Sequence, residues 1–208
     1  MINKFLKAKH WQLFIFMFGI PFIFQILMMV TIFSNINSNE NPDPKIFINA
    51  FSFLPIAILI NTGALFGWFW SIAIGFQKYI PSNIKMSITR FKVFFFIPLV
   101  YLIAITLLIG GFLSQISQMG VDQSNVETMS SSIGMIFPLH ILSMFGIFHS
   151  MYFAAKTFKI VELQKEVSFS EFAGEFFLLW FYFIGVWILQ PKINKMFDEL
   201  SKKSDIEI

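Results

Sequence analysis

Residues 11–39 read WQLFIFMFGIPFIFQILMMVTIFSNINSN, a stretch without a single Asp, Glu, Lys or Arg. Three more long stretches of this kind follow at 46–77, 93–121 and 128–155, and a shorter one covers 176–191. A helix needs about 20 apolar residues to cross the hydrocarbon core of a bilayer. Each of the first four stretches is long enough, so the pattern predicts an all-α, polytopic transmembrane helical bundle.

The composition agrees with this fold class. Charged residues make up 13% of the chain, compared with about a quarter in soluble proteins, and hydrophobic residues make up 56%. The polar connections are short, so we expect one helical domain over residues 1–191, followed by a polar tail at 192–208. The chain has no cysteine, which excludes disulfides and thiolate metal sites. Its net charge of +3 is explained by membrane topology, so no nucleic-acid partner is expected.

Five helices are predicted from the charge-free stretches. We expect them at about 11–33, 52–77, 93–115, 134–155 and 171–190. The first is an uncleaved anchor, because its apolar core is longer than that of a signal peptide. The stretch 46–77 would be about 48 Å long as one helix. Pro55 is therefore expected to divide it into a short interfacial lead and a tilted span, with a re-entrant hairpin as the alternative.

The distribution of basic residues predicts the orientation, because Lys and Arg concentrate on the cytoplasmic side. If the N-terminus is cytoplasmic, the inside segments carry ten basic residues and the outside loops carry only Lys45. The ten are Lys4, Lys7, Lys9, Lys78, Lys85, Arg90, Lys92, Lys156, Lys159 and Lys165. We expect five spans with the tail outside. The alternative is four spans plus a re-entrant or interfacial C-terminal helix, which keeps the tail lysines inside.

Local signals mark both ends of the fifth predicted helix. Ser168 and Glu171 fit a capping box at its start, and Pro191 is expected to end it. Before it, residues 156–166 are expected to continue the fourth helix into the cytoplasm, where Lys159 and Glu162 have the i,i+3 spacing of an ion pair.

Two parts of the chain resemble a known kind of protein. The first comprises residues 7–14 (KAKHWQLF) and 18–21 (FGIP), and the second comprises 161–168 (VELQKEVS), 175–180 (EFFLLW) and 189–194 (LQPKIN). Together they cover about a quarter of the chain. Both resemble uncharacterised small inner-membrane proteins typical of Bacteroidota. The resemblance implies a bacterial cytoplasmic (inner) membrane location and carries no activity, cofactor or site residue with it.

Ionisable residues inside a membrane are candidates for function, because their burial is expensive. Here they are His140 and His149 in the fourth helix and Glu171 and Glu175 near the start of the fifth. The two histidines are nine residues apart, about 180° around a helix, so they are not expected to share a metal. A hydrogen bond from each to a neighbouring helix is expected, and a proton relay or a ligand contact is the alternative. The two glutamates are expected to cap the fifth helix, with cation binding or proton relay as the alternative.

Uncharged polar residues supply the remaining candidates. Asn61 and Thr62 interrupt the second helix, where unwound backbone can coordinate an ion. Interhelical hydrogen bonds and close packing at Gly63 and Gly67 are expected instead. In the fourth helix, Ser143 forms one polar edge with His140.

The function predicted from these observations is non-catalytic. The chain has no P-loop, no Rossmann glycine pattern and no zinc-protease or nucleophile-elbow motif, and its first four predicted helices contain no Asp or Glu. We therefore expect no catalytic residue, no metal and no cofactor. The expected role is an accessory or structural subunit of a membrane complex, with lipid and other membrane subunits, or a second copy, as partners. A small transporter or channel is the alternative, and an intramembrane enzyme comes third. A channel would be lined by Asn61, Thr62, Thr106, His140 and Ser143.

Overall fold

The structure, a computed structural model, describes residues 1–38, 50–119 and 123–206. This part of the chain is helical and contains no strand. The short N-terminal elements are α1 (Ile2–Lys7), α2 (His10–Phe14) and the π-helix η1 (Ile15–Gly19). The remaining elements are α3 (Ile20–Ser38), α5 (Leu54–Gly75), the 3₁₀-helix η2 (Gln77–Tyr79), α6 (Ile88–Met119), α7 (Gln123–Leu163), α8 (Phe169–Trp180) and α9 (Tyr182–Ile206).

Four segments of the described chain are long and apolar enough to cross a membrane. They are His10–Ile36, Leu54–Tyr79, Ile88–Gln115 and Ile136–Leu163. These segments match the first four predicted helices, so the class of polytopic helical membrane protein is confirmed. The helix α5 begins at Leu54 with Pro55 in its first turn, where proline is tolerated because the first N–H groups have no intrahelical partner. This start of α5 agrees with the predicted division of the stretch 46–77 at Pro55, whereas residues 46–49 of the predicted lead lie outside the described residues.

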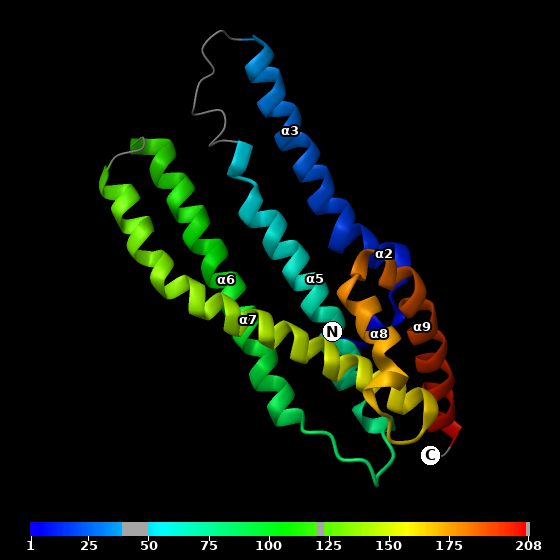
Figure 1. Cartoon of the computed structure of the whole chain (residues 1–208). Coiled ribbons are helices and arrows are strands. Elements are labelled where there is room, and N and C mark those ends of the chain that lie inside the picture. The colour runs from blue at the N-terminus through cyan, green and yellow to red at the C-terminus, as the bar shows by residue number, and fades with distance from the viewer. Residues whose placement is uncertain (39–49, 120–122, 207–208) are drawn as a thin grey trace.

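The fifth predicted helix is divided into two. The backbone leaves helical geometry at Phe181, where ψ is 54°, and α9 turns back beside α8 (Figure 1). The turn is tight, because a Cβ atom on Gly185 would overlap the backbone carbonyl of Leu178. Five full spans are therefore not confirmed: neither of these two helices is among the four segments of the described chain that could span a membrane.

The prediction that Pro191 ends the helix is wrong. The helix α9 continues through Pro191 to Ile206, so the predicted polar tail is helical as far as that residue. Proline removes one backbone hydrogen bond from a helix. The segment is nevertheless fixed in place, because the side chains of Gln190 and Asn194 on either side of the proline bind the backbone of the N-terminal segment.

Among the other prolines that lie in spans, Pro21 and Pro98 each have a local structural feature that accommodates them. The π-helix η1 directly precedes Pro21, and a π-bulge is one way to absorb a missing hydrogen bond within a helix. In α6, Pro98 packs against Gly146 of α7. A Cβ atom on that glycine would lie 2.6 Å from the carbonyl oxygen of Phe94, so the two helices approach closely only because residue 146 is glycine.

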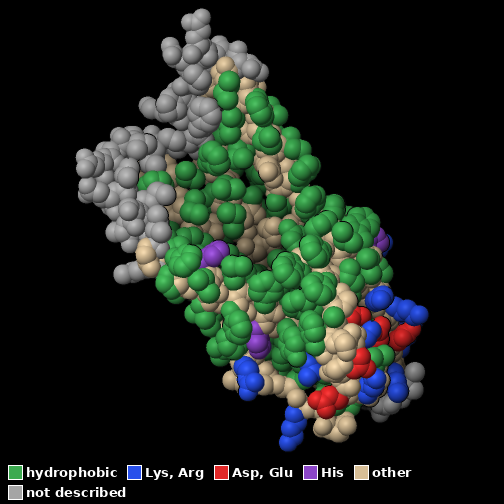
Figure 2. All heavy atoms as spheres, in the orientation of Figure 1, with side chains coloured by type: hydrophobic (Ala, Val, Ile, Leu, Met, Phe, Trp, Pro, Cys, Tyr) green, Lys and Arg blue, Asp and Glu red, His purple; other side chains and the backbone are tan. Residues whose placement is uncertain are grey.

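The buried core lies in one half of the bundle, where α1, α8 and α9 pack against the spans (Figure 1). In α5 the buried side chains are concentrated between residues 66 and 73, and in α7 between 150 and 161. The opposite half of the bundle is more open: most of the large side chains of α3 are exposed. Most charged side chains in view gather at the end where α8 and α9 lie, and hydrophobic side chains predominate over the rest of the described surface on this face (Figure 2). The bundle therefore has one polar end and an apolar body.

Candidate functional site

The two candidate histidines both contact α6, at different levels. The Nδ1 atom of His140 lies 3.1 Å from the hydroxyl of Tyr101, with which it forms a hydrogen bond. The ring of His149 packs against Phe94, with 4.5 Å between ring centroids and a tilt of 32° between the rings. Its Nδ1 atom is buried and has no hydrogen-bond partner in the described chain, so the hydrogen bond expected for this histidine is not observed at Nδ1. The two histidines are thus engaged with two different partners. Among the residues that the structure describes, no group of three His, Asp, Glu or Cys side chains could hold a metal ion.

The uncharged polar candidates do not come together in one place. The amide Nδ2 of Asn61 donates to the hydroxyl of Tyr182 on α9, 3.4 Å away. Thr62 and Ser143 are buried. Thr106 is buried and donates to the carbonyl of Leu102 in its own helix at 2.6 Å, so its hydroxyl is satisfied within α6.

The two candidate glutamates, both on α8, are each held by a different lysine. Glu175 is buried and lies 3.1 Å from Nζ of Lys159, which also binds Glu162 at 2.7 Å. Glu171 lies 2.7 Å from Nζ of Lys165. The predicted pair of Lys159 with Glu162 is confirmed, and these ion pairs attach α8 to the polar end of α7.

Glu171 also completes the predicted capping box. The backbone N–H of Ser168 donates to its Oε2 atom at 2.8 Å. The hydrogen bond from Lys165, followed by those from the backbone and hydroxyl of Ser168, lowers the pKa of Glu171 to about 2. The carboxylate is therefore charged at neutral pH and stabilises the start of α8.

A cluster of hydrogen bonds holds the N-terminal segment. The chain is extended at Ala8, between α1 and α2, so carbonyl groups at the end of α1 lack helical partners. The Nε2 atom of Gln190 donates to the carbonyls of Phe5 and Ala8, both at 2.9 Å. Asn194 donates to the carbonyls of Leu6 and Ala8, at 2.6 and 3.1 Å. The amides of α9 thus add to the one capping bond at the end of α1, from the N–H of Ala8 to the carbonyl of Phe5, and supply donors for the carbonyls of Leu6 and Ala8.

Two glycines of α5 make room for α1. A Cβ atom on Gly67 would lie 2.5 Å from the ring of Phe5, and one on Gly75 would lie 2.7 Å from Ile2 and Leu6. Gly63, by contrast, has open space where its Cβ would be. The close contact expected at the glycines of α5 therefore involves Gly67 and the N-terminal helix.

A cleft of about 280 Å³ separates α3 from the start of α5. It is lined by Pro21, Phe24, Gln25, Met28, Ala50, Phe53, Leu54, Ala57, Ile58 and Asn61. Its two amide side chains, those of Gln25 and Asn61, come from different helices. Gln25 is exposed and lies near the middle of the span His10–Ile36.

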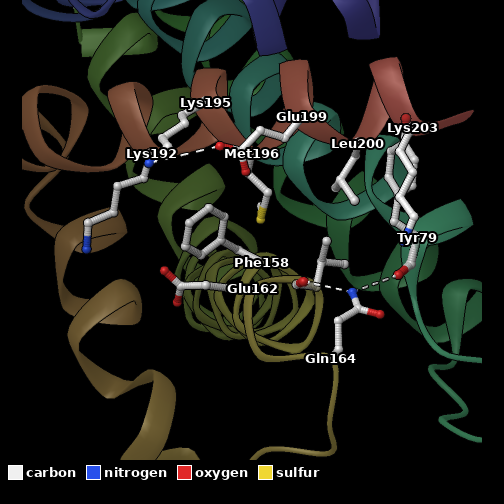
Figure 3. Close-up of a pocket in the computed structure, with 11 residues that line it drawn as sticks. Tyr79, Phe158, Glu162, Gln164, Lys192, Lys195, Met196, Glu199, Leu200 and Lys203 are labelled. Carbon is white, nitrogen blue, oxygen red and sulfur yellow. Dashed lines mark hydrogen bonds and ion pairs between the residues drawn. The ribbon is translucent and has the colours of Figure 1, made fainter. Parts of the chain in front are cut away.

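A larger groove of about 760 Å³ lies at the polar end, between the last turns of α7 and the C-terminal half of α9 (Figure 3). We call it the basic groove. It is lined by Tyr79, Phe158, Val161, Glu162, Gln164, Lys192, Lys195, Met196, Glu199, Leu200 and Lys203. At its edge, Gln164 adopts a φ of 52° and donates to the carbonyl of Tyr79 at 3.3 Å, which ties the end of α7 to η2.

The sequence analysis did not single out Gln25, Gln190, Asn194 or Trp68. The candidates were ionisable residues and the polar residues of the second and fourth helices, and the amides of Gln25, Gln190 and Asn194 belong to neither group. An amide within an apolar run is a usable signal, because an unpaired polar group in hydrocarbon is costly. Applied to the first span, this criterion would have identified Gln25.

Comparison with known proteins identified no relative of this chain. No family model, no curated protein and no solved structure matches this chain.

Proposed function

We propose that this chain is a non-catalytic accessory subunit of the bacterial inner membrane, which binds a transmembrane helix of another membrane protein along α3. The observation that carries the proposal is the exposed amide of Gln25 in the middle of the first span.

The burial of the spans supports a contact at α3. In the most apolar window of the span His10–Ile36, 11% of the residues are buried, compared with 50% in Leu54–Tyr79. The helix α3 packs on α5 and η1, and large side chains such as Ile26, Val30 and Phe33 are exposed. Most of this helix is therefore free to meet lipid or another protein.

The chemistry of Gln25 favours protein over lipid at this surface. Lipid tails offer no hydrogen-bond partner, so polar side chains within spans commonly bind neighbouring helices. Gln25 lines a cleft with Asn61 on the facing helix. A partner helix that inserts a polar side chain here would give the amide of Gln25 a hydrogen-bond partner within the span.

The proposed topology has four spans and a re-entrant hairpin, with the N-terminus and the tail both cytoplasmic. The hairpin of α8 and α9 lies at the end where charged side chains gather (Figures 1 and 2). With this topology, Lys45 is the one basic residue outside among the 15 of the chain. That distribution follows the positive-inside rule more closely than five spans do.

Copurification from native membranes tests the proposed role. The tagged full-length protein, the variant Gln25→Leu and the control variant Thr31→Val would each be extracted in mild detergent and their bound proteins identified by mass spectrometry. Thr31 lies in the same helix, but its hydroxyl already donates to the carbonyl of Leu27 at 2.9 Å. We expect one membrane protein to be retained by the wild type and by Thr31→Val and to be lost from Gln25→Leu.

Two outcomes would contradict the proposal. One is the absence of any specifically retained membrane protein in the wild type. The other is equal retention by Gln25→Leu, which would show that the amide makes no contribution to the contact.

A transporter or channel is the alternative, and it predicts flux in proteoliposomes that falls in Asn61→Leu and His140→Leu. The contacts of these residues favour it less, because Asn61 binds Tyr182 on α9 whereas His140 binds Tyr101 on α6. Flux that is absent, or unchanged in both variants, would remove this alternative.

A further inference from the structure

We propose that the basic groove binds the phosphate headgroup of an anionic phospholipid of the cytoplasmic leaflet. This inference concerns a different surface from the α3 contact and does not depend on it. The groove has a volume of about 760 Å³, within the range of about 300–1,000 Å³ that is typical of small-molecule sites.

The lining of the groove matches an amphiphile with a negative headgroup. Apolar side chains, including Phe158 and Met196, lie between the two helices, and Lys192, Lys195 and Lys203 of α9 line the groove above them (Figure 3). Basic pockets beside membrane helices on the cytoplasmic side are a common arrangement for anionic lipid headgroups. The combination of an apolar floor and several ammonium groups therefore fits a phospholipid better than a small free anion.

The two carboxylates of the groove offset part of this positive charge, but neither forms an ion pair with Lys192 or Lys203. Glu162 is engaged by Lys159, which does not line the groove, at 2.7 Å. Glu199 lies 4.0 Å from Lys195, a long separation for an ion pair. Among the residues that the structure describes, no ion pair is formed by Lys192 or Lys203, so both remain available to a phosphate.

Tyr79 adds a polar group to one end of the groove. It extends from η2 toward α9 beside Lys203 (Figure 3), and its hydroxyl is buried with no hydrogen-bond partner in the described chain. A buried hydroxyl without a partner is costly. A phosphate oxygen that enters beside Lys203 could accept this hydrogen bond.

The position of the groove is that of a lipid headgroup. Lys192 directly follows the apolar stretch 176–191, and the groove lies at the charged end of the bundle (Figure 2). In the proposed topology this level is the cytoplasmic surface of the membrane, where anionic lipids are exposed to basic side chains.

Native mass spectrometry of the full-length protein in nonionic detergent tests the assignment, with phosphatidylglycerol as the probe and phosphatidylcholine as the neutral-headgroup comparison. The triple variant Lys192→Gln, Lys195→Gln, Lys203→Gln removes the positive charge of the groove. The control triple variant Lys4→Gln, Lys85→Gln, Lys92→Gln removes the same charge from exposed lysines that do not line it. Replacing the three groove lysines with arginine retains the charge.

We expect the wild type, the control and the arginine variant to bind phosphatidylglycerol more tightly than phosphatidylcholine. The groove variant should lose roughly tenfold or more in affinity for phosphatidylglycerol, as expected for the removal of several juxtamembrane lysines. Equal affinity of the wild type for the two lipids would overturn the proposal. An equal loss in the groove and control variants would also overturn it. Displacement of the lipid by millimolar inorganic phosphate would show that the site recognises a free anion instead.

Discussion

The indole N–H of Trp68 donates a hydrogen bond to Oε1 of Gln190 at 2.8 Å, with both side chains fully buried. The same amide donates through Nε2 to the carbonyls of Phe5 and Ala8. One side chain of α9 therefore connects α5 with the N-terminal segment. A buried amide with all of its contacts satisfied is stabilising, whereas removal of one partner leaves the others unpaired.

Replacing Gln190 with leucine should destabilise the bundle strongly. The change leaves the Trp68 indole N–H buried without a partner, which costs about 1–3 kcal/mol. It also removes one hydrogen bond from each of the carbonyls of Phe5 and Ala8, which retain the N–H of Ala8 and the amide of Asn194 as donors. We expect the free energy of unfolding in mixed micelles to fall by about 3 kcal/mol. The variant Asn83→Ala, in an exposed loop, serves as the control and should leave stability unchanged. Equal stability of the two variants would show that the cluster around Gln190 contributes nothing.

The capping box predicts a dependence of stability on pH. The folded pKa of Glu171, about 2, is lower than its ordinary value of 4.5. Its stabilising contribution is therefore complete above pH 4.5 and is lost as the pH falls toward 2. The melting temperature in detergent should decrease over this window by more in the wild type than in Glu171→Gln, which has no carboxylate to titrate. Parallel curves for the two proteins would contradict this account.

The hairpin of α8 and α9 predicts the side on which the tail lies. The chain has no cysteine, so single cysteines can be introduced at Lys202, Lys85 and Ile36 and labelled with an impermeant maleimide in spheroplasts. In the proposed topology, Lys85 lies on the cytoplasmic side and Ile36 lies at the opposite end of the first span. We expect the cysteine at 202 to behave like that at 85 and to react only after permeabilisation. Labelling of 202 in intact spheroplasts would restore the five-span topology.

The contact of Gly146 with α6 predicts a sharp difference between two glycines. A methyl group at 146 would lie 2.6 Å from the carbonyl oxygen of Phe94 and 2.7 Å from Pro98, whereas one at Gly111 meets nothing within 4 Å. Gly146→Ala should lower the free energy of unfolding by about 1–3 kcal/mol, as overpacking does. Gly111→Ala should be neutral or stabilising, because alanine favours the helix by about 1 kcal/mol. Denaturant titration in micelles measures both changes, and an equal effect would show that the two helices separate at no cost.

Hydropathy and local signals predicted the parts of the fold that depend on neighbours in sequence. The span predicted at 52–77 is observed at Leu54–Tyr79, and the capping box formed by Ser168 and Glu171 is present. Both depend on residues within one helix. The hydropathy of a helix and the capping of its first turn are properties of the segment alone. Both features could therefore be predicted without knowledge of the tertiary packing.

The turn at Phe181 and the continuation through Pro191 depend on distant contacts, and the sequence analysis did not predict them. The turn lies in an aromatic run without proline, and Gly185 is four residues further along. The helix beyond Pro191 is fixed by Asn194, whose amide binds carbonyls 186 and 188 residues away. A pattern of neighbouring residues in the sequence cannot predict a hydrogen-bond partner that lies so far away along the chain. The resemblance to Bacteroidota inner-membrane proteins and the accessory role remain predictions.

The hydrogen bonds that hold α1 have a consequence for the order of events during biosynthesis. The donors on Gln190 and Asn194 leave the ribosome 182 to 188 residues after the carbonyls of Phe5, Leu6 and Ala8 to which they bind. Chains are synthesised at about 5–20 residues per second, so these carbonyls wait for roughly ten seconds or more for their donors. The N-terminal segment therefore gains these side-chain hydrogen bonds only when α9 joins α1, late in the synthesis of this bundle.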